Sequence, residues 1–295
     1  MKSVLITGGT GFFGQAMVKH LLTLPDEGIY RICIYSRDEA KQATMRAMLT
    51  DPDERLRWFI GDVRDQARLR QAMEGVDVVI HAAALKRIET GFYNPQEMIK
   101  TNIEGAVNVI TAATEECRHR GGANPIRVVA LSTDKAYQPV SPYGLSKAMA
   151  ESLFLSANNT RGSYGPIFAA VRYGNVWNST GSLLPTWRGQ RQSGAPLRVT
   201  DPECTRFYMT REQAVDLVIK TTVNMRGGEL AIPDLPAYRV GDVLEAFLNE
   251  QYDYPIKTVG LPAFEKLHES MDANRSSATA RRMTVTELKE AIQNA

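Results

Sequence analysis

Short apolar runs rich in β-branched residues alternate with longer amphipathic segments through the first half of the chain. Strands are predicted over residues 3–7, 31–36, 56–62, 76–83, 126–132 and 167–174. Helices are predicted between them, near 14–24, 38–49, 65–74, 96–118 and 143–158. Because the strand runs are apolar almost throughout, they are typical of strands buried on both faces. Right-handed crossovers then predict an α/β fold with a Rossmann-type, doubly wound parallel sheet.

A glycine-rich turn, "ITGGTGFFGQ", joins the first predicted strand to the first helix. Glycine permits a tight turn and a close backbone approach to phosphate, and the helix N-terminus adds partial positive charge. A glycine-rich turn without a ligand is the alternative. The position in a βαβ unit favours a dinucleotide site, and its expected residues are Gly8, Thr10, Gly11, Phe12, Phe13 and Gly14.

The end of the second strand is expected to select the cofactor. An acidic residue there would hold the ribose 2′-OH of NAD, but Ser36 and Arg37 occupy that position, with Lys41 one helical turn later. A hydroxyl and a guanidinium suit a 2′-phosphate, so NADP is favoured over NAD; a solvated Arg37 is the alternative. Further cofactor contacts are expected where the next two strands end, at Asp62, Val63, Ala82, Ala83 and Ala84.

Residues 132–147, "STDKAYQPVSPYGLSK", carry an unusual density of proton donors and acceptors. Tyr143 and Lys147 are four residues apart at the start of a predicted helix and share one face. An ammonium beside a phenol is expected to lower the phenol pKa from its usual ~10. Lys147 could also bond a nicotinamide ribose. Because Ser132 and Thr133 end the preceding strand, a chance Tyr-x-x-x-Lys match is disfavoured.

These motifs resemble those of the extended short-chain dehydrogenase/reductases. Together with "HAAALKRI", "ALSTDKAYQP", "YGLSKAMAE", "VRYGNV" and "EKLHESM", about residues 2–271 resemble the inverting UDP-N-acetylglucosamine 4,6-dehydratases. The most specific element is Thr133-Asp134-Lys135, since dehydratases that retain C5 configuration carry Asp-Glu in place of Asp-Lys. Among the departures from the family, Leu261 stands where an Arg is usual, and the tail after Met271 lacks an obvious match.

The resemblance implies a lyase that oxidises C4 of a hexose and then removes water across C5 and C6. Tyr143 would take the 4-OH proton, while Thr133 would hydrogen-bond O4. Lys135, neutral in part through burial and neighbouring charge, would take the C5 proton. Asp134, if protonated, would donate to the departing 6-OH; a surface ion pair between Asp134 and Lys135 is the alternative.

The resemblance also implies which other residues contact the two ligands. Lys86 and Thr101 are expected at the cofactor. Residues expected at the UDP-sugar are Lys86, Lys100, Asn102, Tyr173, Asn175, Arg206 and Glu265. Arg206 would clamp the diphosphate as a bidentate donor, with a structural ion pair as the alternative.

Beyond residue 174 the βα rhythm breaks, Pro and Gly become frequent, and helices are expected only over 210–224 and 239–251. We therefore expect a dinucleotide-binding Rossmann domain over 1–174 and a smaller substrate-binding lobe over 175–295. Exchange of a strand or helix between the two stays open. The ligand cleft is expected between them, at the carboxyl ends of the strands.

Composition disfavours several other classes of protein. A net charge of +2 provides no field that would attract nucleic acid. No apolar run is long enough to cross a bilayer, and no signal-peptide pattern precedes the first strand. Cys33, Cys117 and Cys204 are widely spaced without CxxC, which fits a cytoplasmic protein without a metal site. The resemblance implies a homo-oligomer, either a dimer or a hexamer.

Two other functions stay open. A UDP-sugar C4 or C5 epimerase would share Tyr143, Lys147 and the cofactor. A C4 epimerase has no need of Asp134 and Lys135, and a C5 epimerase would keep the 6-OH. A non-catalytic NADP-binding regulator would be expected to have lost Tyr143 or Lys147, and both are present.

Overall fold

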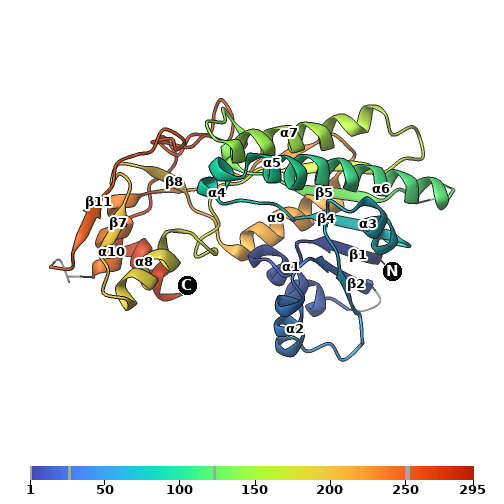
Figure 1. Cartoon of the computed structure of the whole chain (residues 1–295), viewed down its shortest axis with the longest axis horizontal. Helices are drawn as coiled ribbons and strands as arrows, with labels where there is room; N and C mark the ends of the chain where they lie inside the picture. Colours follow the sequence, from blue (N-terminus) through green and yellow to red (C-terminus); the bar gives the residue numbers. More distant parts are fainter. Residues whose placement is uncertain (1, 26–27, 122–123, 250–252) are drawn as a thin grey trace.

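The larger lobe of the protein is built around a parallel sheet (Figure 1). The computed structural model describes residues 2–25, 28–121, 124–249 and 253–295. The strands of the sheet are β1 (Lys2–Thr7), β2 (Ile29–Ser36), β3 (Leu56–Ile60), β4 (Val78–His81), β5 (Arg127–Leu131), β6 (Ile167–Val171) and β9 (Leu230–Ala231). All neighbouring strands pair in parallel, in the order β3-β2-β1-β4-β5-β6-β9. The predicted doubly wound sheet is confirmed.

Helices cover both faces of this sheet. One face carries α1 (Phe12–Thr23), α2 (Glu39–Met48) and α9 (Arg211–Asn224), and the other carries α3 (Gln66–Met73), α6 (Gly105–His119) and α7 (Pro142–Ser156). Side chains alternate along each strand, so Val4 and Ile6 of β1 join the core under α1, whereas Leu5 joins the core under α6. Two apolar cores therefore sandwich the sheet.

Capping residues mark where several helices begin. Asp38 accepts a hydrogen bond from the Lys41 backbone N–H at α2, and Asp65 accepts one from Arg68 at α3. Ser141 does the same for Gly144 at α7, where Pro142 occupies the first turn. Each bond satisfies a backbone donor that the helix itself leaves free.

The helix predicted over 96–118 is composite. It consists of α5 (Pro95–Met98), a π-helical stretch η1 (Ile99–Glu104) and α6. Helix α4 (Ile88–Tyr93) precedes it and was not predicted. Two short 3₁₀ turns, η2 (Asp134–Ala136) and η3 (Ala157–Asn159), flank α7.

A second lobe lies beyond the carboxyl ends of the strands (Figure 1). Its elements are α8 (Leu183–Gln192), β7 (Leu197–Val199), β8 (Thr205–Phe207), β10 (Ala237–Arg239), α10 (Val240–Leu248), β11 (Ile256–Thr258) and α11 (Val285–Gln293). Trp187, Phe247 and Leu288 belong to its own apolar core. Helix α10 corresponds to the helix expected over 239–251, of which positions 250–251 lie outside the described residues.

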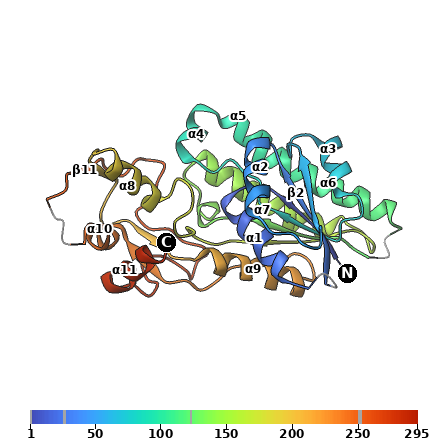
Figure 2. The ribbon, with the colours of Figure 1, turned by 90° about the horizontal axis from the view of Figure 1, so that it is seen from below.

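The chain crosses from the sheet to this lobe more than once. Helix α9 packs against α1, as Figure 2 shows, and contributes Ala214, Val215 and Val218 to the core beneath α1. Strand β9 then pairs with the edge of β6, with Leu230 opposite Ala170. The helix expected over 210–224 therefore exists but packs on the sheet, because its apolar face covers the part of the sheet next to α1.

The tail after Met271 completes the second lobe. Its backbone runs beside β10, where Met283 N–H donates to the Ala237 carbonyl at 2.9 Å. Helix α11 then packs on α10, and Leu288 is fully buried. Leu261, which stands where the family usually has an Arg, packs against the same core.

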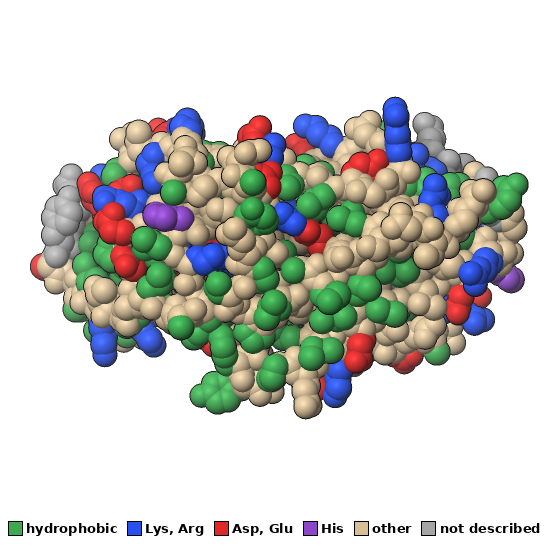
Figure 3. Space-filling view, turned by 90° about the horizontal axis from the view of Figure 1, so that it is seen from above, with side chains coloured by type: hydrophobic (Ala, Val, Ile, Leu, Met, Phe, Trp, Pro, Cys, Tyr) green, Lys and Arg blue, Asp and Glu red, His purple; other side chains and the backbone are tan. Residues whose placement is uncertain are grey.

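Exposed apolar side chains occur on the face formed by α6 and α7. Val107, Leu145 and Met149 on these helices are all exposed. In Figure 3, which views the molecule from above, hydrophobic side chains lie between charged ones on this side. Within the described ranges, no helix has the length and hydrophobicity needed to cross a membrane.

Candidate active site

Two glycines in the turn after β1 lie so close to neighbouring backbone that a side chain would not fit at either position. Gly8 has a φ of +69°, and a Cβ there would lie 2.8 Å from the Ala83 backbone N. A Cβ at Gly14 would lie 2.5 Å from the Gly9 carbonyl oxygen. Gly11 caps α1 without a side-chain hydrogen bond, so the backbone N–H groups at the start of α1 have no side-chain cap. This geometry can hold a pyrophosphate.

The turn is joined to the end of β2 by a hydrogen bond. Thr10 Oγ1 donates to Ser36 Oγ at 2.9 Å, and both residues are buried. Arg37 follows with half of its side chain exposed, and its guanidinium lies 3.4 Å from Asp62 Oδ2. Lys41 is exposed and pairs with Asp38 at 3.0 Å. Of these predicted residues, the structure therefore brings Thr10 to Ser36 and Arg37 to Asp62, and leaves Lys41 at the periphery.

Asp62 is engaged by two arginines. Besides Arg37, Arg64 contacts Asp62 Oδ2 at 2.6 Å. Burial acts to raise the pKa of Asp62, but the bonds from Arg64 and the charge of Arg37 hold it below its usual range. Val63 next to it is buried in the core beneath α6. Asp62 is thus ionised at the sheet edge, whereas Val63 acts mainly in packing.

The loop after β4 and the stretch η1 hold four polar predicted residues in different settings. Asn102 is buried and bonds the Leu85 backbone N–H and carbonyl at 2.8 and 2.9 Å. Thr101 is buried next to it, and its Oγ1 has no hydrogen-bond partner. Lys86 is exposed, and Lys100 pairs with Glu97 at 3.1 Å on the surface. The structure thus gives Asn102 a structural bridge and leaves the two lysines outside the buried centre.

The Thr133-Asp134-Lys135 segment forms a buried hydrogen-bonded cluster directly after β5. Thr133 Oγ1 donates to Asp134 Oδ1 at 3.0 Å, and Lys135 Nζ lies 3.2 Å from the same oxygen. Asp134 is fully buried, and its Oδ2 has no hydrogen-bond partner. Burial raises the pKa of Asp134 above its ordinary value. A raised pKa makes it easier for this carboxyl to accept and carry a proton, as a proton donor must.

Lys135 Nζ is surrounded by three oxygen acceptors. Besides Asp134 Oδ1, it lies 3.2 Å from Asn175 Oδ1 and 3.3 Å from Glu269 Oε1. Burial acts to lower the pKa of Lys135, but the carboxylates of Asp134 and Glu269 raise it above its ordinary value. The expectation of a partly neutral Lys135 is therefore wrong for this arrangement, because the two carboxylates outweigh desolvation.

Tyr143 and Lys147 lie in the first two turns of α7, as their spacing predicted. Lys147 Nζ donates to the Leu131 carbonyl at 2.6 Å, and burial lowers its pKa to about 8. Burial raises the pKa of Tyr143, although the charge of Lys135 and a hydrogen bond with Thr133 act to lower it. The expected lowering of the phenol pKa by Lys147 is wrong here, since desolvation dominates and the nearby charge belongs to Lys135.

Arg206 lies on β8 and is mostly buried. Its guanidinium pairs with Glu265 Oε2 at 3.2 Å and donates to the Thr205 and Leu267 carbonyls at 2.8 and 3.2 Å. The structure therefore contains the ion pair that the sequence left as an alternative for Arg206. Tyr173 is buried in the core beneath α1, where burial raises its pKa.

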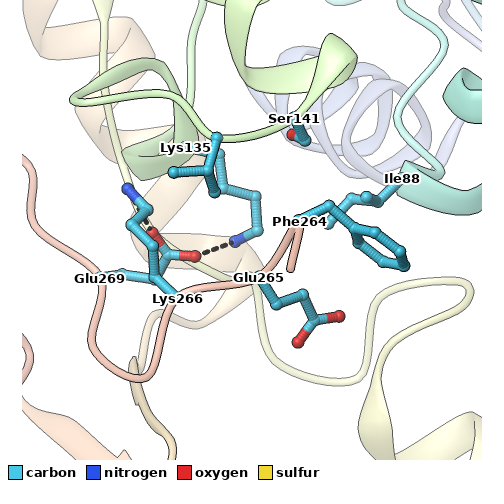
Figure 4. A pocket seen from close by; sticks show the side chains of 8 residues that line it. Ile88, Lys135, Ser141, Phe264, Glu265, Lys266 and Glu269 are labelled. Carbon is cyan, nitrogen blue, oxygen red and sulfur yellow. Dashed lines mark ion pairs between the residues drawn. The ribbon is translucent and has the colours of Figure 1, made fainter. Parts of the chain in front are cut away.

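Glu269 is the functional candidate that sequence reasoning missed. It belongs to "EKLHES", which was singled out only for its family resemblance. Its side chain is buried between Lys135 and Lys266 (Figure 4). A small pocket adjoins this contact and is lined by Ile88, Lys135, Val140, Ser141, Phe264, Glu265, Lys266 and Glu269. An apolar spacing pattern carries no signal for such a contact, because Glu269 and Lys135 are far apart in the chain.

Comparison with known proteins identifies relatives of this chain. UDP-N-acetylglucosamine 4,6-dehydratase (inverting) of Campylobacter jejuni subsp. jejuni serotype O:2 is 43% identical over 277 residues, or 94% of this chain and 79% of that protein. UDP-glucose 4-epimerase of Rickettsia conorii is 38% identical over 282 residues, or 95% of this chain and 80% of that protein. The predicted resemblance is therefore confirmed, with epimerases among the relatives.

Solved structures show the same fold. The structure of Pen from Bacillus thuringiensis has a TM-score of 0.91 and 31% identity, covering 100% of this chain and 98% of that chain. DesIV of Streptomyces venezuelae, a dTDP-glucose 4,6-dehydratase, has a TM-score of 0.80 at 21% identity, covering 99% of this chain and 96% of that chain, and supports the fold alone. The model of the family described as "Polysaccharide biosynthesis protein" matches residues 4–289, and the chain belongs to that family.

Proposed function

We propose that the protein is an NADP-dependent UDP-N-acetylglucosamine 4,6-dehydratase that inverts C5 and forms a 4-keto-6-deoxy sugar nucleotide. The observation that carries this proposal is the contact between Asp134 Oδ1 and Lys135 Nζ at 3.2 Å, in which the side chains are 0% and 17% exposed. A surface ion pair would be solvated, whereas this pair is enclosed at the carboxyl end of β5. A dehydratase needs such an acid and base beside its oxidation site.

Oxidation at C4 comes first because the C5 proton of an unoxidised hexose is not acidic. A dinucleotide held by the glycine turn and Lys147 would accept hydride from C4 and supply it to C6. Tyr143 takes the 4-OH proton, and Thr133 hydrogen-bonds O4. Lys147, with its pKa lowered to about 8 by burial, orients the nicotinamide ribose through its amine.

Elimination then uses the neighbouring pair. One proton moves from Lys135 Nζ to Asp134 Oδ1 across 3.2 Å, which leaves an amine and a carboxylic acid. The amine takes the C5 proton, the C6–O bond breaks, and Asp134 protonates the departing 6-OH, which leaves as water. Lys135 and Asp134 end as ammonium and carboxylate, as they began. The proton that Tyr143 took from the 4-OH balances the one that later returns to C5 on the opposite face, which inverts that carbon.

Cofactor binding is assigned to residues 1–174 and sugar binding mainly to 175–295. The glycine turn from Gly8 to Gly14 holds the pyrophosphate. Ser36 and Arg37 bind the 2′-phosphate, supported by the position of both at the end of β2. Asn175 and Arg206 extend the site toward the UDP diphosphate, supported by Asn175 lying 3.2 Å from Lys135 Nζ.

We also propose a homo-oligomer that works in the cytoplasm. The exposed apolar side chains of Val107, Leu145 and Met149 on α6 and α7 support an interface between copies. Cys33, Cys117 and Cys204 are buried with free thiols, which supports a reducing compartment. Light scattering of the purified protein measures its oligomeric state, and a monomer at micromolar concentration would contradict the proposed homo-oligomer.

The rival function is a UDP-sugar epimerase, favoured by the 38% identity to the Rickettsia conorii protein. Incubation with UDP-N-acetylglucosamine followed by mass spectrometry and NMR of the product separates the two. A dehydratase product is lighter by one water and shows a C4 ketone, a C6 methyl group and inverted C5. An isomer of unchanged mass would instead show an epimerase.

A further inference from the structure

Glu269 joins the C-terminal segment to the proposed C5 base. Its Oε1 lies 3.3 Å from Lys135 Nζ, and its Oε2 lies 3.0 Å from Lys266 Nζ. The side chain is 2% exposed, and Figure 4 shows it between the two ammonium groups. A buried carboxylate normally requires such partners. In the proposed reaction Lys135 takes the C5 proton, and Glu269 takes part in none of the steps.

The backbone around Glu269 is held independently of this ion pair. Glu269 N–H donates to Ser277 Oγ at 2.9 Å, and Ser277 N–H donates to the Glu269 carbonyl at 2.8 Å. On either side, Thr205 N–H donates to the Leu267 carbonyl at 2.9 Å, and Arg172 donates to the Met271 carbonyl. The position of the carboxylate is therefore set by the fold of the segment.

The contacts of Lys135 Nζ match its donors in number. An ammonium has three N–H groups, and the three acceptors around it are Asp134 Oδ1, Asn175 Oδ1 and Glu269 Oε1. Without the Glu269 carboxylate, one N–H would lose its acceptor, and the direction of the amine would be less restricted.

The charges that face this group come from several elements. Asp134 and Glu269 are the carboxylates, and Arg206 of β8 is the cation that acts on Lys135 directly. Lys266 acts on Glu269 from the same segment. The phenols in the field of Lys135 are Tyr143 of α7 and Tyr238 of β10.

We propose that Glu269 is a positioning residue that orients the Lys135 amine and sets the pH range in which the Asp134–Lys135 pair performs acid-base chemistry. This inference rests on the proposed dehydratase function. Its electrostatic consequence has a definite sign. The charge of Glu269 acts to raise the pKa of Lys135 and that of Asp134 alike, so neutralising it lowers both.

The test compares two variants that both disturb the same segment. Glu269→Gln removes the negative charge at nearly constant size. Lys266→Met removes the cation on the other side of Glu269 and also the 2.9 Å bond from Lys266 to the Tyr137 carbonyl. Local loosening of the segment would change the pH dependence of both variants in the same direction. The two charge changes, in contrast, should shift the pKa values of Lys135 and Asp134 in opposite directions.

The measurement is the pH dependence of kcat/KM for product formation and of C5 exchange with solvent deuterium. Both limbs of the Glu269→Gln profile should move to lower pH, by roughly one unit or more. The Lys266→Met limbs should stay or move to higher pH. An unshifted Glu269→Gln profile, or an equal acid shift in both variants, would overturn the proposal.

A readout that needs no catalysis separates this inference from the proposed function. Competitive acetylation of Lys135 with acetic anhydride, followed across pH by peptide mass spectrometry, reports the amine directly. The midpoint should fall in Glu269→Gln relative to wild type, and an equal midpoint overturns the inference. If the wild-type protein forms no dehydrated product, the proposed function is wrong. The labelling result would still show whether Glu269 raises the pKa of Lys135.

A third variant covers failure of Glu269→Gln to fold. Glu269→Asp keeps the charge but shortens the reach toward Lys135 Nζ. It should lower kcat by roughly 10- to 100-fold through misplacement of the base, with limbs close to those of wild type. Wild-type kcat in this variant would show that the position of the carboxylate does not matter.

Discussion

Lys147 Nζ donates a hydrogen bond to the backbone carbonyl of Leu131 at 2.6 Å, which joins the second turn of α7 to the end of β5. The amine is buried, and its pKa is lowered to about 8. Together with the apolar packing of α7, this contact holds the helix that carries Tyr143 against the strand that leads into Thr133. Because Lys147 is buried, the free energy of unfolding also depends on whether its amine is protonated.

The stability of the protein should therefore depend on pH through Lys147. Its folded pKa of about 8 lies below the ordinary value of 10.5, so the unfolded chain keeps the proton longer as pH rises. Lys147 should destabilise the fold fully below about pH 8, and this penalty should disappear between about pH 8 and 10.5. Urea unfolding at about pH 7 and 9.5 should show wild type gaining stability relative to Lys147→Met. A pH-independent difference between the two would contradict this.

Cofactor preference should follow the charge at position 37. Arg37 is half exposed at the end of β2, where a 2′-phosphate would meet it. Arg37→Asp should weaken NADP binding and reverse or abolish the preference for NADP, because an acid there suits a ribose 2′-OH. Calorimetry with both cofactors measures this. Equal affinity of the wild type for NAD and NADP would rule out the assignment.

Hydride should be recycled within each turnover. UDP-N-acetylglucosamine deuterated at C4 should give product deuterated at C6, with no added oxidant after the enzyme is loaded with cofactor. NMR of the product locates the label. Stoichiometric accumulation of NADPH would instead indicate a simple dehydrogenase.

Removal of the Lys135 amine should stop proton transfer at C5. Lys135→Ala keeps the glycine turn, Tyr143 and Lys147, so cofactor binding should persist. Loss of a positioned base typically costs 10²–10⁴-fold, and turnover and C5 deuterium exchange should fall by about that factor. The exposed Lys220 of α9 provides the matched control, and Lys220→Ala should retain wild-type turnover. Near-normal product formation by Lys135→Ala would show that another group is the base.

The buried pair between Arg172 and Glu151 should be important for stability. Arg172 Nε donates to Glu151 Oε2 at 3.0 Å, and the same guanidinium bonds the Met271 carbonyl. Glu151→Gln leaves the buried guanidinium without its counter-charge and should lower the free energy of unfolding by about 3–5 kcal/mol.

A surface pair provides the comparison for this prediction. Arg281 pairs with Glu287 at 2.9 Å, and its side chain is 63% exposed. Arg281→Gln should change the free energy of unfolding by less than about 1 kcal/mol. Urea denaturation measures the free energy of unfolding of both variants. An equal loss in the two would show that the buried pair of Arg172 stabilises the protein no more than the surface pair does.

The features that depend on local order along the chain could be predicted from the amino-acid sequence. Apolar runs of strand length identified the first six strands of the sheet, because strands buried on both faces leave few polar positions. Gly8 and Gly14 stand out because no side chain fits there. Thr133, Asp134 and Lys135 are consecutive, and Tyr143 and Lys147 are one helical turn apart, so their convergence needs no distant contact.

Contacts between segments that are remote in the chain could be seen only in the folded protein. Three contacts join parts of the chain that no periodicity connects: the packing of α9 on α1, the packing of Leu261 against the core of the second lobe, and the approach of Glu269 to Lys135. The pKa of Lys135 is raised by the carboxylate of its neighbour Asp134 together with that last contact. Composition and spacing identify an amine beside a carboxylate, but the balance of desolvation and Coulomb attraction depends on where the second carboxylate lies.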